Sequence, residues 1–147
     1  METVLFIKPI KEFAIVVAFE KDSKVYVHDA SIFSDIESCI GYAKNILQNQ
    51  DTNYPLVKVV FDASIYDQEA LSLRELNICN VVLHSPKKKA EHRIMNNTNS
   101  IKSFIFRKTQ TDNYSRFMNI YESFNQSDYN IALDVLSDVS AFYQSQV

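Results

Sequence analysis

Glycine is almost absent from this sequence: Gly41 stands alone among 147 residues, where average usage would give about ten. A loop that cradles a phosphate needs several glycines, because the backbone must come close to the phosphate oxygens. The sequence therefore excludes P-loop, dinucleotide-binding and kinase-type nucleotide sites. Its tight turns must be made by Asp, Asn, Ser and Pro instead.

Cysteine and histidine are also scarce and show no metal-ligand spacing. Cys39 and Cys79 lie far apart without a CxxC pattern, and the histidines are His28, His84 and His92. We interpret the cysteines as buried thiols in a reducing compartment. Neither GxSxG nor HExxH occurs, so hydrolase and zinc-site interpretations have no support, and we expect no bound metal or other cofactor.

Long apolar runs and a strong charge imbalance are missing as well. No apolar run approaches the roughly 20 residues of a membrane span, and no basic-then-apolar leader is visible. We therefore expect a cytoplasmic protein, in the host cytoplasm if it is viral, with no membrane partner. The net charge of −3 gives no general attraction to nucleic acid.

What the sequence has is enough apolar material, 46% of its residues, for one proper core. We expect a single domain over residues 1–147. Apolar and β-branched runs predict three antiparallel strands joined by short turns, at 3–8, 13–20 and 24–29. A helix follows to about residue 50, opened by a capping box from Ser34 to Glu37. A nearly all-apolar run at 56–61 then predicts a buried, central, parallel strand that ends at Asp62.

The second half is less regular. We predict a helix at 67–76, a strand at 80–84 and a charged connection at 86–93. No element is predicted for residues 94–108 as a whole; within them the segment IKSFIFRK, residues 101–108, fits either an edge strand or a short helix, and both stay open. Aromatic spacing predicts a third helix marked by Tyr114, Phe117, Met118, Tyr121 and Phe124. A last helix, capped by Ser127 or Asp128, carries Ile131, Val135, Val139 and Phe142 on one stripe and Asp134 and Asp138 on another.

Three segments resemble the nuclease domain of phage large terminases. They are the opening LFIKPIKEFAIVVAF, the central KVVFDASIYDQEALSLRELNICNVVLHSPKKKAEHR and the ending DYNIALDVLSDVSAF. The resemblance implies an α/β ribonuclease-H-like fold: a mixed five-stranded sheet of order 3-2-1-4-5, with a three-strand antiparallel meander, two parallel strands and helices packed on it. It also implies two-metal phosphodiester cleavage, in which carboxylates hold two divalent ions.

Carried onto this chain, the family's acids fall on Asp62 at the end of the fourth strand and on Asp134 in the last helix, with Asp138 four residues further. Asn130 and Ile131 lie where family members tend to carry paired aspartates. Alternative interpretations stay open for each candidate. Asp62 would turn the chain before Ser64, and Asp134 and Asp138 would form the solvated side of an amphipathic helix. Glu37 would be a fourth acid or the partner of Ser34 in the capping box.

The first-strand acid of the family falls on Lys8. An ammonium group cannot bind a metal ion, and at about 4 Å in a partly desolvated site it would repel one by several kcal/mol. One hypothesis is that Lys8 takes the place of the missing metal ion and pairs with Asp62. The other is that Lys8 extends to solvent at a strand end.

One basic cluster remains, formed by Lys87, Lys88, Lys89, His92 and Arg93. It would contact nucleic-acid phosphates, or form an ordinary solvated surface. We conclude that the chain is a degenerate, non-catalytic nuclease-like domain of phage origin that binds nucleic acid or protein, with a protein partner expected.

Two alternatives stay open. One is an active two-metal-ion DNA nuclease that uses Mg²⁺ or Mn²⁺. The other is an interaction subunit with no nucleic-acid role, whose interface is formed partly by the aromatics of the last two helices (Tyr114, Phe117, Tyr121, Phe124, Phe142 and Tyr143).

Overall fold

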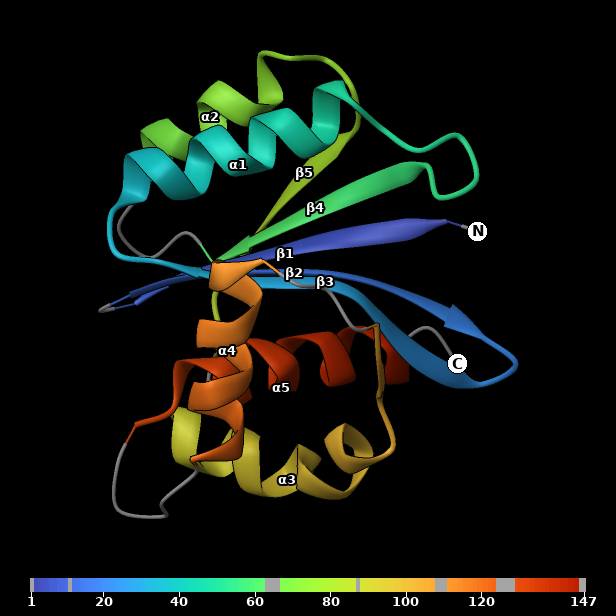
Figure 1. The fold of residues 1–147 in the computed structure, drawn as a ribbon, viewed down its shortest axis with the longest axis vertical. Helices are drawn as coiled ribbons and strands as arrows, with labels where there is room; N and C mark the ends of the chain where they lie inside the picture. Colours follow the sequence, from blue (N-terminus) through green and yellow to red (C-terminus); the bar gives the residue numbers. More distant parts are fainter. Residues whose placement is uncertain are drawn as a thin grey trace.

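The computed structural model describes residues 2–10, 12–62, 67–86, 88–107, 111–123 and 129–145. A twisted mixed sheet lies between two layers of helices (Figure 1). The strands are β1 (Thr3–Ile10), β2 (Glu12–Lys21), β3 (Lys24–Phe33), β4 (Leu56–Asp62), β5 (Asn80–His84) and β6 (Ile105–Phe106). The helices are α1 (Ile36–Gln48), α2 (Asp67–Arg74), α3 (Ala90–Lys102), α4 (Asp112–Glu122) and α5 (Ile131–Gln144).

The sheet has the order β5-β4-β1-β2-β3-β6. The predicted order 3-2-1-4-5 is confirmed, and the two-residue strand β6 extends it beyond β3. The meander pairs β1, β2 and β3 antiparallel, whereas β4 pairs parallel with both β1 and β5. The β2–β3 turn uses Asp22 and Ser23, both at positive φ, which suits a two-residue hairpin loop without glycine.

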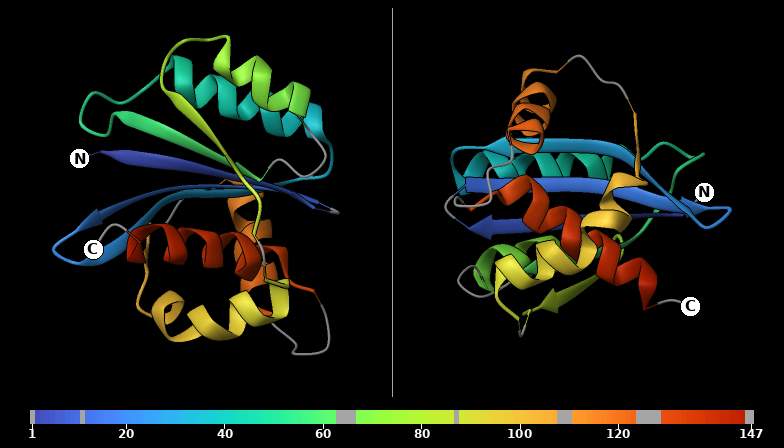
Figure 2. Two further views of the ribbon diagram at one scale, coloured as in Figure 1. Left: turned by 180° about the vertical axis from the view of Figure 1, so that it is seen from behind. Right: turned by 90° about the horizontal axis from the view of Figure 1, so that it is seen from below.

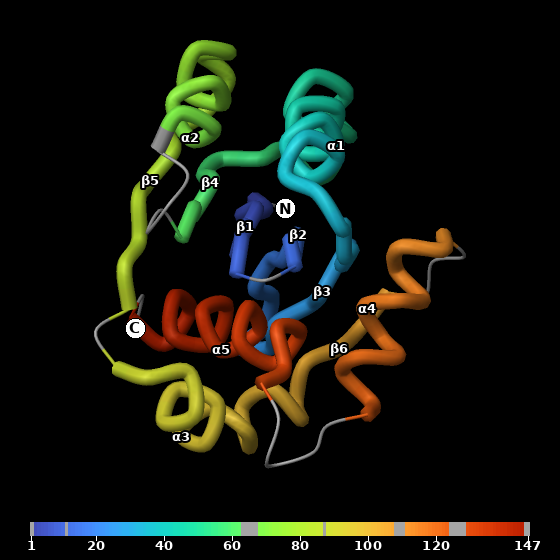
Figure 3. The backbone as a smooth tube through the Cα atoms, turned by 90° about the vertical axis from the view of Figure 1, so that its left-hand side faces the viewer, coloured from blue at the N-terminus to red at the C-terminus, as the bar shows by residue number. Residues whose placement is uncertain are grey.

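Alternation along the central strands creates a core on each face of the sheet. Leu5 and Ile7 of β1 pack with α1 and α2, whereas Val4 and Phe6 pack with α4 and α5. Figures 2 and 3 show α1 and α2 on one side of the sheet and α3, α4 and α5 on the other. Lys8 continues the series of Val4 and Phe6, so the side chain enters the core on the α5 side.

Several sequence predictions need correction. The expected charged connection at 86–93 is too long, because α3 already begins at Ala90. In the segment 101–108, the last residues of α3 are followed by the short strand β6 at the edge of the sheet. The N-cap of α1 is Asp35, whose side chain accepts from the backbone N–H of Ser38, so a capping box on Ser34 and Glu37 is wrong. The N-cap of α5 is Asn130; the expected caps, Ser127 and Asp128, lie outside the described residues.

The aromatics of the last two helices serve mainly as core. Phe117 is fully buried, Tyr114 and Tyr143 are nearly so, and Tyr121 and Phe142 pack against the same core. Phe124 lies outside the described residues. Within the described part of the chain, no helix has the length and apolarity needed to cross a membrane.

Candidate functional site

Lys8 lies where the C-terminal ends of β1 and β4 meet the start of α5. The parallel pairing of Ile7 with Phe61 places Lys8 beside Asp62, and Asp62 in turn pairs with His84 of β5. Each of these polar residues terminates or nearly terminates its strand, and strand ends of this kind carry the sites of most α/β proteins. Here, α5 closes over them.

The ammonium group of Lys8 contacts three carboxylates. Its Nζ lies 2.7 Å from Asp138 Oδ2, 3.0 Å from Asp134 Oδ1 and 3.2 Å from Asp62 Oδ2. The Lys8 side chain is 0% exposed. Because an ammonium has three N–H donors and no acceptor, each donor has one carboxylate oxygen within reach. The hypothesis that Lys8 extends to solvent is therefore wrong.

Helix α5 buries both of its aspartates. Asp134 is 0% and Asp138 is 8% exposed, and their i, i+4 spacing places them on one face toward Lys8. Every residue from Ile131 to Ser140 is buried, so the interpretation of this pair as the solvated side of an amphipathic helix is wrong. The neighbouring Ser137 has its hydrogen-bond partner within α5, because its hydroxyl donates to the backbone carbonyl of Leu133.

Arg93 of α3 supplies a second cation. Its Nη1 donates to Asp134 Oδ1 and lies 3.2 Å from Asp138 Oδ1, while its Nε donates to the carbonyl of Lys88. The Tyr129 hydroxyl donates to Asp134 Oδ2 at 2.6 Å. Asp134 therefore has contacts from Lys8, Arg93 and Tyr129, which is what a buried carboxylate requires. We call Lys8, Asp62, Arg93, Asp134 and Asp138 the ion cluster.

Charge in the ion cluster is nearly balanced, with two cations against three carboxylates. Burial raises the pKa of Asp138, and the nearby Lys8 ammonium opposes that rise. Burial, followed by the Asp134 charge, raises the pKa of the Tyr129 hydroxyl, so Tyr129 acts as a donor at neutral pH. His84 Nε2 lies 3.8 Å from Asp138 Oδ1, at the half-exposed edge of the cluster.

The ion cluster does not fit the divalent ions that the terminase resemblance implies. A Mg²⁺ or Mn²⁺ site needs oxygen ligands around an open centre, whereas here the centre of the carboxylates is taken by the Nζ of Lys8. Across the ranges that the structure describes, no group of three His, Cys, Asp or Glu side chains is arranged to hold a metal ion. The carboxylates of this cluster are engaged in ion pairs with Lys8 and Arg93.

The structure brings some of the predicted site residues together and separates others. Lys8, Asp62, Asp134 and Asp138 meet, as the resemblance implied. Glu37 is exposed in the first turn of α1, and α1 packs on the opposite face of the sheet (Figure 3). Among the basic residues, Lys88, Lys89 and His92 are exposed, and Lys87 lies outside the described residues.

Sequence reasoning missed the role of Arg93, which it grouped with the exposed lysines. The guanidinium enters the ion cluster instead, with its side chain only 16% exposed. A signal for this was present: Arg93, Ile94, Asn97 and Ile101 follow helical spacing, and Asn97 and Ile101 are buried in α3. Extending the predicted helix toward Ala90 would have placed Arg93 on its inner face. The part played by Tyr129 had no comparable signal.

Comparisons with known proteins establish the fold. No protein-family model and no curated protein matches the sequence. Among solved structures, the chain is similar to the human cytomegalovirus terminase nuclease domain soaked with manganese, with a TM-score of 0.58 and 7% identity over 93% of this chain and 81% of that chain. It is also similar to a manganese-soaked, inhibitor-bound form of that domain, with a TM-score of 0.62 and 8% identity over 96% and 85%.

At such low identity, the similarity shows the fold alone. The chain has the ribonuclease-H-like fold of a terminase nuclease domain.

Proposed function

We propose that this chain is a non-catalytic, nuclease-like domain that acts as a binding module for nucleic acid or protein. One observation carries the proposal: the ammonium group of buried Lys8 lies within 3.2 Å of all three candidate carboxylates. An internal cation at this point neutralises acids that would otherwise repel one another, and it competes with any divalent ion for the same oxygens. The arrangement supports a structural use of the carboxylates.

A cleavage assay tests the non-catalytic half of this proposal. Wild-type protein incubated with plasmid DNA and Mn²⁺ or Mg²⁺ should produce no more nicking than the Asp62→Asn variant, which keeps the shape of the side chain but removes its charge. The wild-type melting temperature should be the same in EDTA and in excess Mn²⁺. Mn²⁺-dependent cleavage that is lost in Asp62→Asn would instead support the active two-metal nuclease.

The nucleic-acid half of the proposal rests on the exposed loop that leads into α3. Lys88 and Lys89 are exposed there, and His92 is exposed in the first turn of α3. Lysines on a free surface attract phosphates.

We expect weak, salt-sensitive binding of duplex DNA. The double variant Lys88→Gln/Lys89→Gln should weaken it and reduce the slope of log K against log [salt] by about one to two. Lys44→Gln/Lys102→Gln makes the same charge change elsewhere and should leave the slope unchanged. If both double variants have the same slope of log K against log [salt], this loop does not contact the DNA.

A second candidate is an interaction subunit with no nucleic-acid role, and the β5 side of the sheet favours it. Within the described part of the sheet, β5 is an edge strand, and Leu71, Ile78 and Leu83 around it are each more than a third exposed. Unpaired edge strands with apolar neighbours are surfaces on which partner strands add. This candidate would be supported if the wild type binds no DNA but forms a defined complex with a partner protein, and if Leu83→Lys abolishes that complex.

A further inference from the structure

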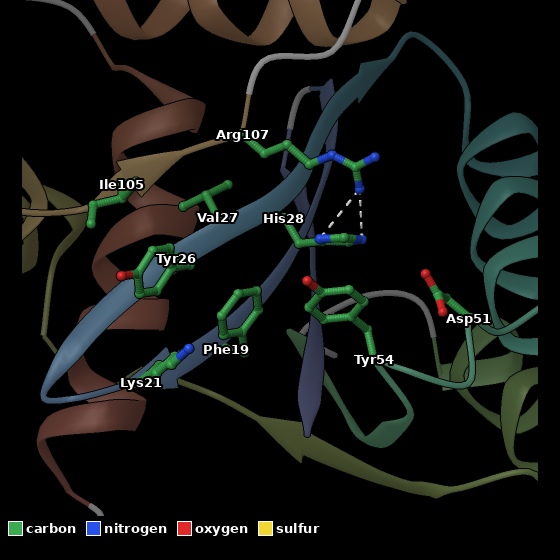
Figure 4. Close-up of a pocket in the computed structure, with 9 residues that line it drawn as sticks. All are labelled: Phe19, Lys21, Tyr26, Val27, His28, Asp51, Tyr54, Ile105 and Arg107. Carbon is green, nitrogen blue, oxygen red and sulfur yellow. Dashed lines mark hydrogen bonds between the residues drawn. The ribbon is translucent and has the colours of Figure 1, made fainter. Parts of the chain in front are cut away.

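A second polar site lies at the opposite end of the strands from the ion cluster. It is a pocket of about 450 Å³, lined by Phe19, Tyr26, His28 and Tyr54 together with Lys21 and Arg107 (Figure 4). Phe19 lies near the end of β2, which the antiparallel register places beside the start of β1. No residue of the ion cluster lines this pocket, so an inference from it does not depend on whether the ion cluster is catalytic.

The aromatic rings in this pocket form a contiguous group. Phe19 stacks on Tyr26 with ring centroids 5.0 Å apart and planes 7° apart, and His28 stacks on Tyr54 at 4.7 Å. Phe19 and Tyr54 join the two pairs at 5.5 Å. These rings lie outside both hydrophobic cores formed by the described residues. Phe19 is only 9% exposed, whereas Tyr26, His28 and Tyr54 are half-buried and leave ring surface open.

A β-bulge places His28 in this group. The register between β2 and β3 shifts after Val17, which pairs with Asp29, because Ala18 pairs with Val27. His28 is thus the extra residue, without a partner on β2. Bulges redirect side chains and are common next to functional sites. Here the bulge brings His28 toward Tyr54 of the α1–β4 loop (Figure 4), so the β2–β3 hairpin and this loop build one surface.

Positive charge flanks the rings in a protein whose net charge is negative. The Arg107 Nη1 lies 2.9 Å from His28 Nε2. Burial and the Arg107 charge lower the pKa of His28, so the imidazole is neutral and accepts from the guanidinium. Lys21 lines the pocket near Phe19 and Tyr26, and both cations are exposed. Two carboxylates lie nearby and have donors of their own. Asp51 accepts from the backbone N–H of Asn53 at 2.9 Å, and Asp29, beside His28, accepts from the backbone N–H of Ala30 and from the Tyr42 hydroxyl.

We propose that this pocket binds single-stranded nucleic acid, with a base stacked on the open faces of Tyr26 and Tyr54 and the adjoining phosphates held by Lys21 and Arg107. Aromatic platforms between cations are the usual means of binding single strands without sequence preference, because every base offers a π-face. Duplex DNA keeps its bases stacked inside and cannot use such a platform.

The surface beyond the pocket favours a strand over a free nucleotide. An adjoining hollow of about 360 Å³ shares His28, Asp51, Tyr54 and Arg107 with it. Arg107 thus lies where the two hollows meet, in position to hold a phosphate between two successive nucleotides. A free mononucleotide would fill one hollow and gain nothing from the second.

Binding of a fluorescently labelled oligothymidylate, followed by anisotropy at low salt, tests this proposal. Tyr54→Ala should weaken binding about tenfold or more, whereas Tyr54→Phe, which keeps the ring, should bind like the wild type. Tyr26→Ser should weaken binding similarly, and Arg107→Gln should weaken it and reduce its salt dependence. Lys44→Gln/Lys102→Gln changes charge at two residues that line neither hollow and should retain wild-type affinity for the oligonucleotide. Circular dichroism melts confirm that each variant is folded.

Three results would overturn the proposal. The first is that Tyr54→Ala and Tyr54→Phe bind the oligonucleotide with equal affinity. The second is that thymidine monophosphate displaces the oligonucleotide when both are present at the same concentration. The third is loss of oligonucleotide binding in Lys88→Gln/Lys89→Gln with full binding in both Tyr54 variants, which would assign the contact to the loop before α3. None of these results depends on whether the ion cluster binds metal or cleaves DNA.

Discussion

Replacing Lys8 by methionine should lower the free energy of unfolding by about 3–5 kcal/mol, one of the largest effects of any single substitution in this chain. Methionine fills a similar volume but leaves Asp62, Asp134 and Asp138 buried around an apolar group. Arg93 still pairs with Asp134 and Asp138, whereas Asp62 loses its ion pair with Lys8. For a domain of this length the melting temperature should fall by about 6–20 °C, at about 2–4 °C per kcal/mol. Urea denaturation at neutral pH measures the difference directly.

Lys24→Met makes the same chemical change at an exposed position of β3 and should alter stability by no more than about 0.5 kcal/mol. A second comparison separates charge from packing. In the Lys8→Met background, Asp134→Asn should recover part of the loss, because one buried negative charge fewer is left uncompensated. If Lys8→Met is no less stable than Lys24→Met, the buried ion pairs make no net contribution to folding.

Replacing Lys8 by aspartate should convert the ion cluster into a site that binds divalent metal. The side chain of aspartate is shorter than that of lysine and vacates the point where Nζ lies within 3.2 Å of three carboxylates. Four carboxylates would then surround it, a ligand set that suits Mn²⁺ and Mg²⁺. Because Arg93 would still compete for Asp134 and Asp138, the double variant Lys8→Asp/Arg93→Ala should show the larger response.

Metal-dependent stability is the measurement. Without metal the double variant should be strongly destabilised by like-charge repulsion. Mn²⁺ at about one hundred times its Kd should stabilise it by about 2.7 kcal/mol, which corresponds to about 5–10 °C in melting temperature. The variant Lys8→Asn/Arg93→Ala has the same shape without the added carboxylate and should respond far less. If Mn²⁺ does not raise the stability of Lys8→Asp/Arg93→Ala, the prediction is wrong, whether that variant is folded or unfolded in EDTA.

Local sequence patterns were sufficient to predict most of the elements. Apolar and β-branched runs joined by short turns predict the meander, and β5 has the predicted bounds, Asn80–His84. The turn predicted at residues 9–12 is too long, because Pro9 and Ile10 belong to β1 and Glu12 begins β2. The run Leu56–Phe61 is apolar on both faces, which indicates a central parallel strand, and the structure places β4 between β1 and β5. Residues 94–108 were harder, because α3 is polar along much of its length and β6 has only two residues.

The polar site was predictable only in part. The terminase resemblance implied that Lys8, Asp62 and the aspartates of the last helix would be near one another. Asp134 and Asp138 point inward because the first ten residues of α5 are buried on every side. The spacing of the two aspartates is the same for a buried face and for a solvated one, so spacing alone cannot tell the two apart. The entry of Arg93 depends on α3 packing against α5, a contact between segments about forty residues apart.

The sequence by itself determined that this chain cannot use a glycine-rich phosphate loop, that it forms an α/β sheet of known strand order, and that a lysine stands where the terminase resemblance implies an acid. The first property follows from residue type alone, whereas the strand order and the significance of the lysine also depend on the resemblance of three segments to terminase nuclease domains. Only the tertiary structure decided what the charges do. Whether a lysine is a solvated surface group or the centre of three carboxylates depends on which segments bury it, and that is fixed by the packing of α3 and α5 against the sheet.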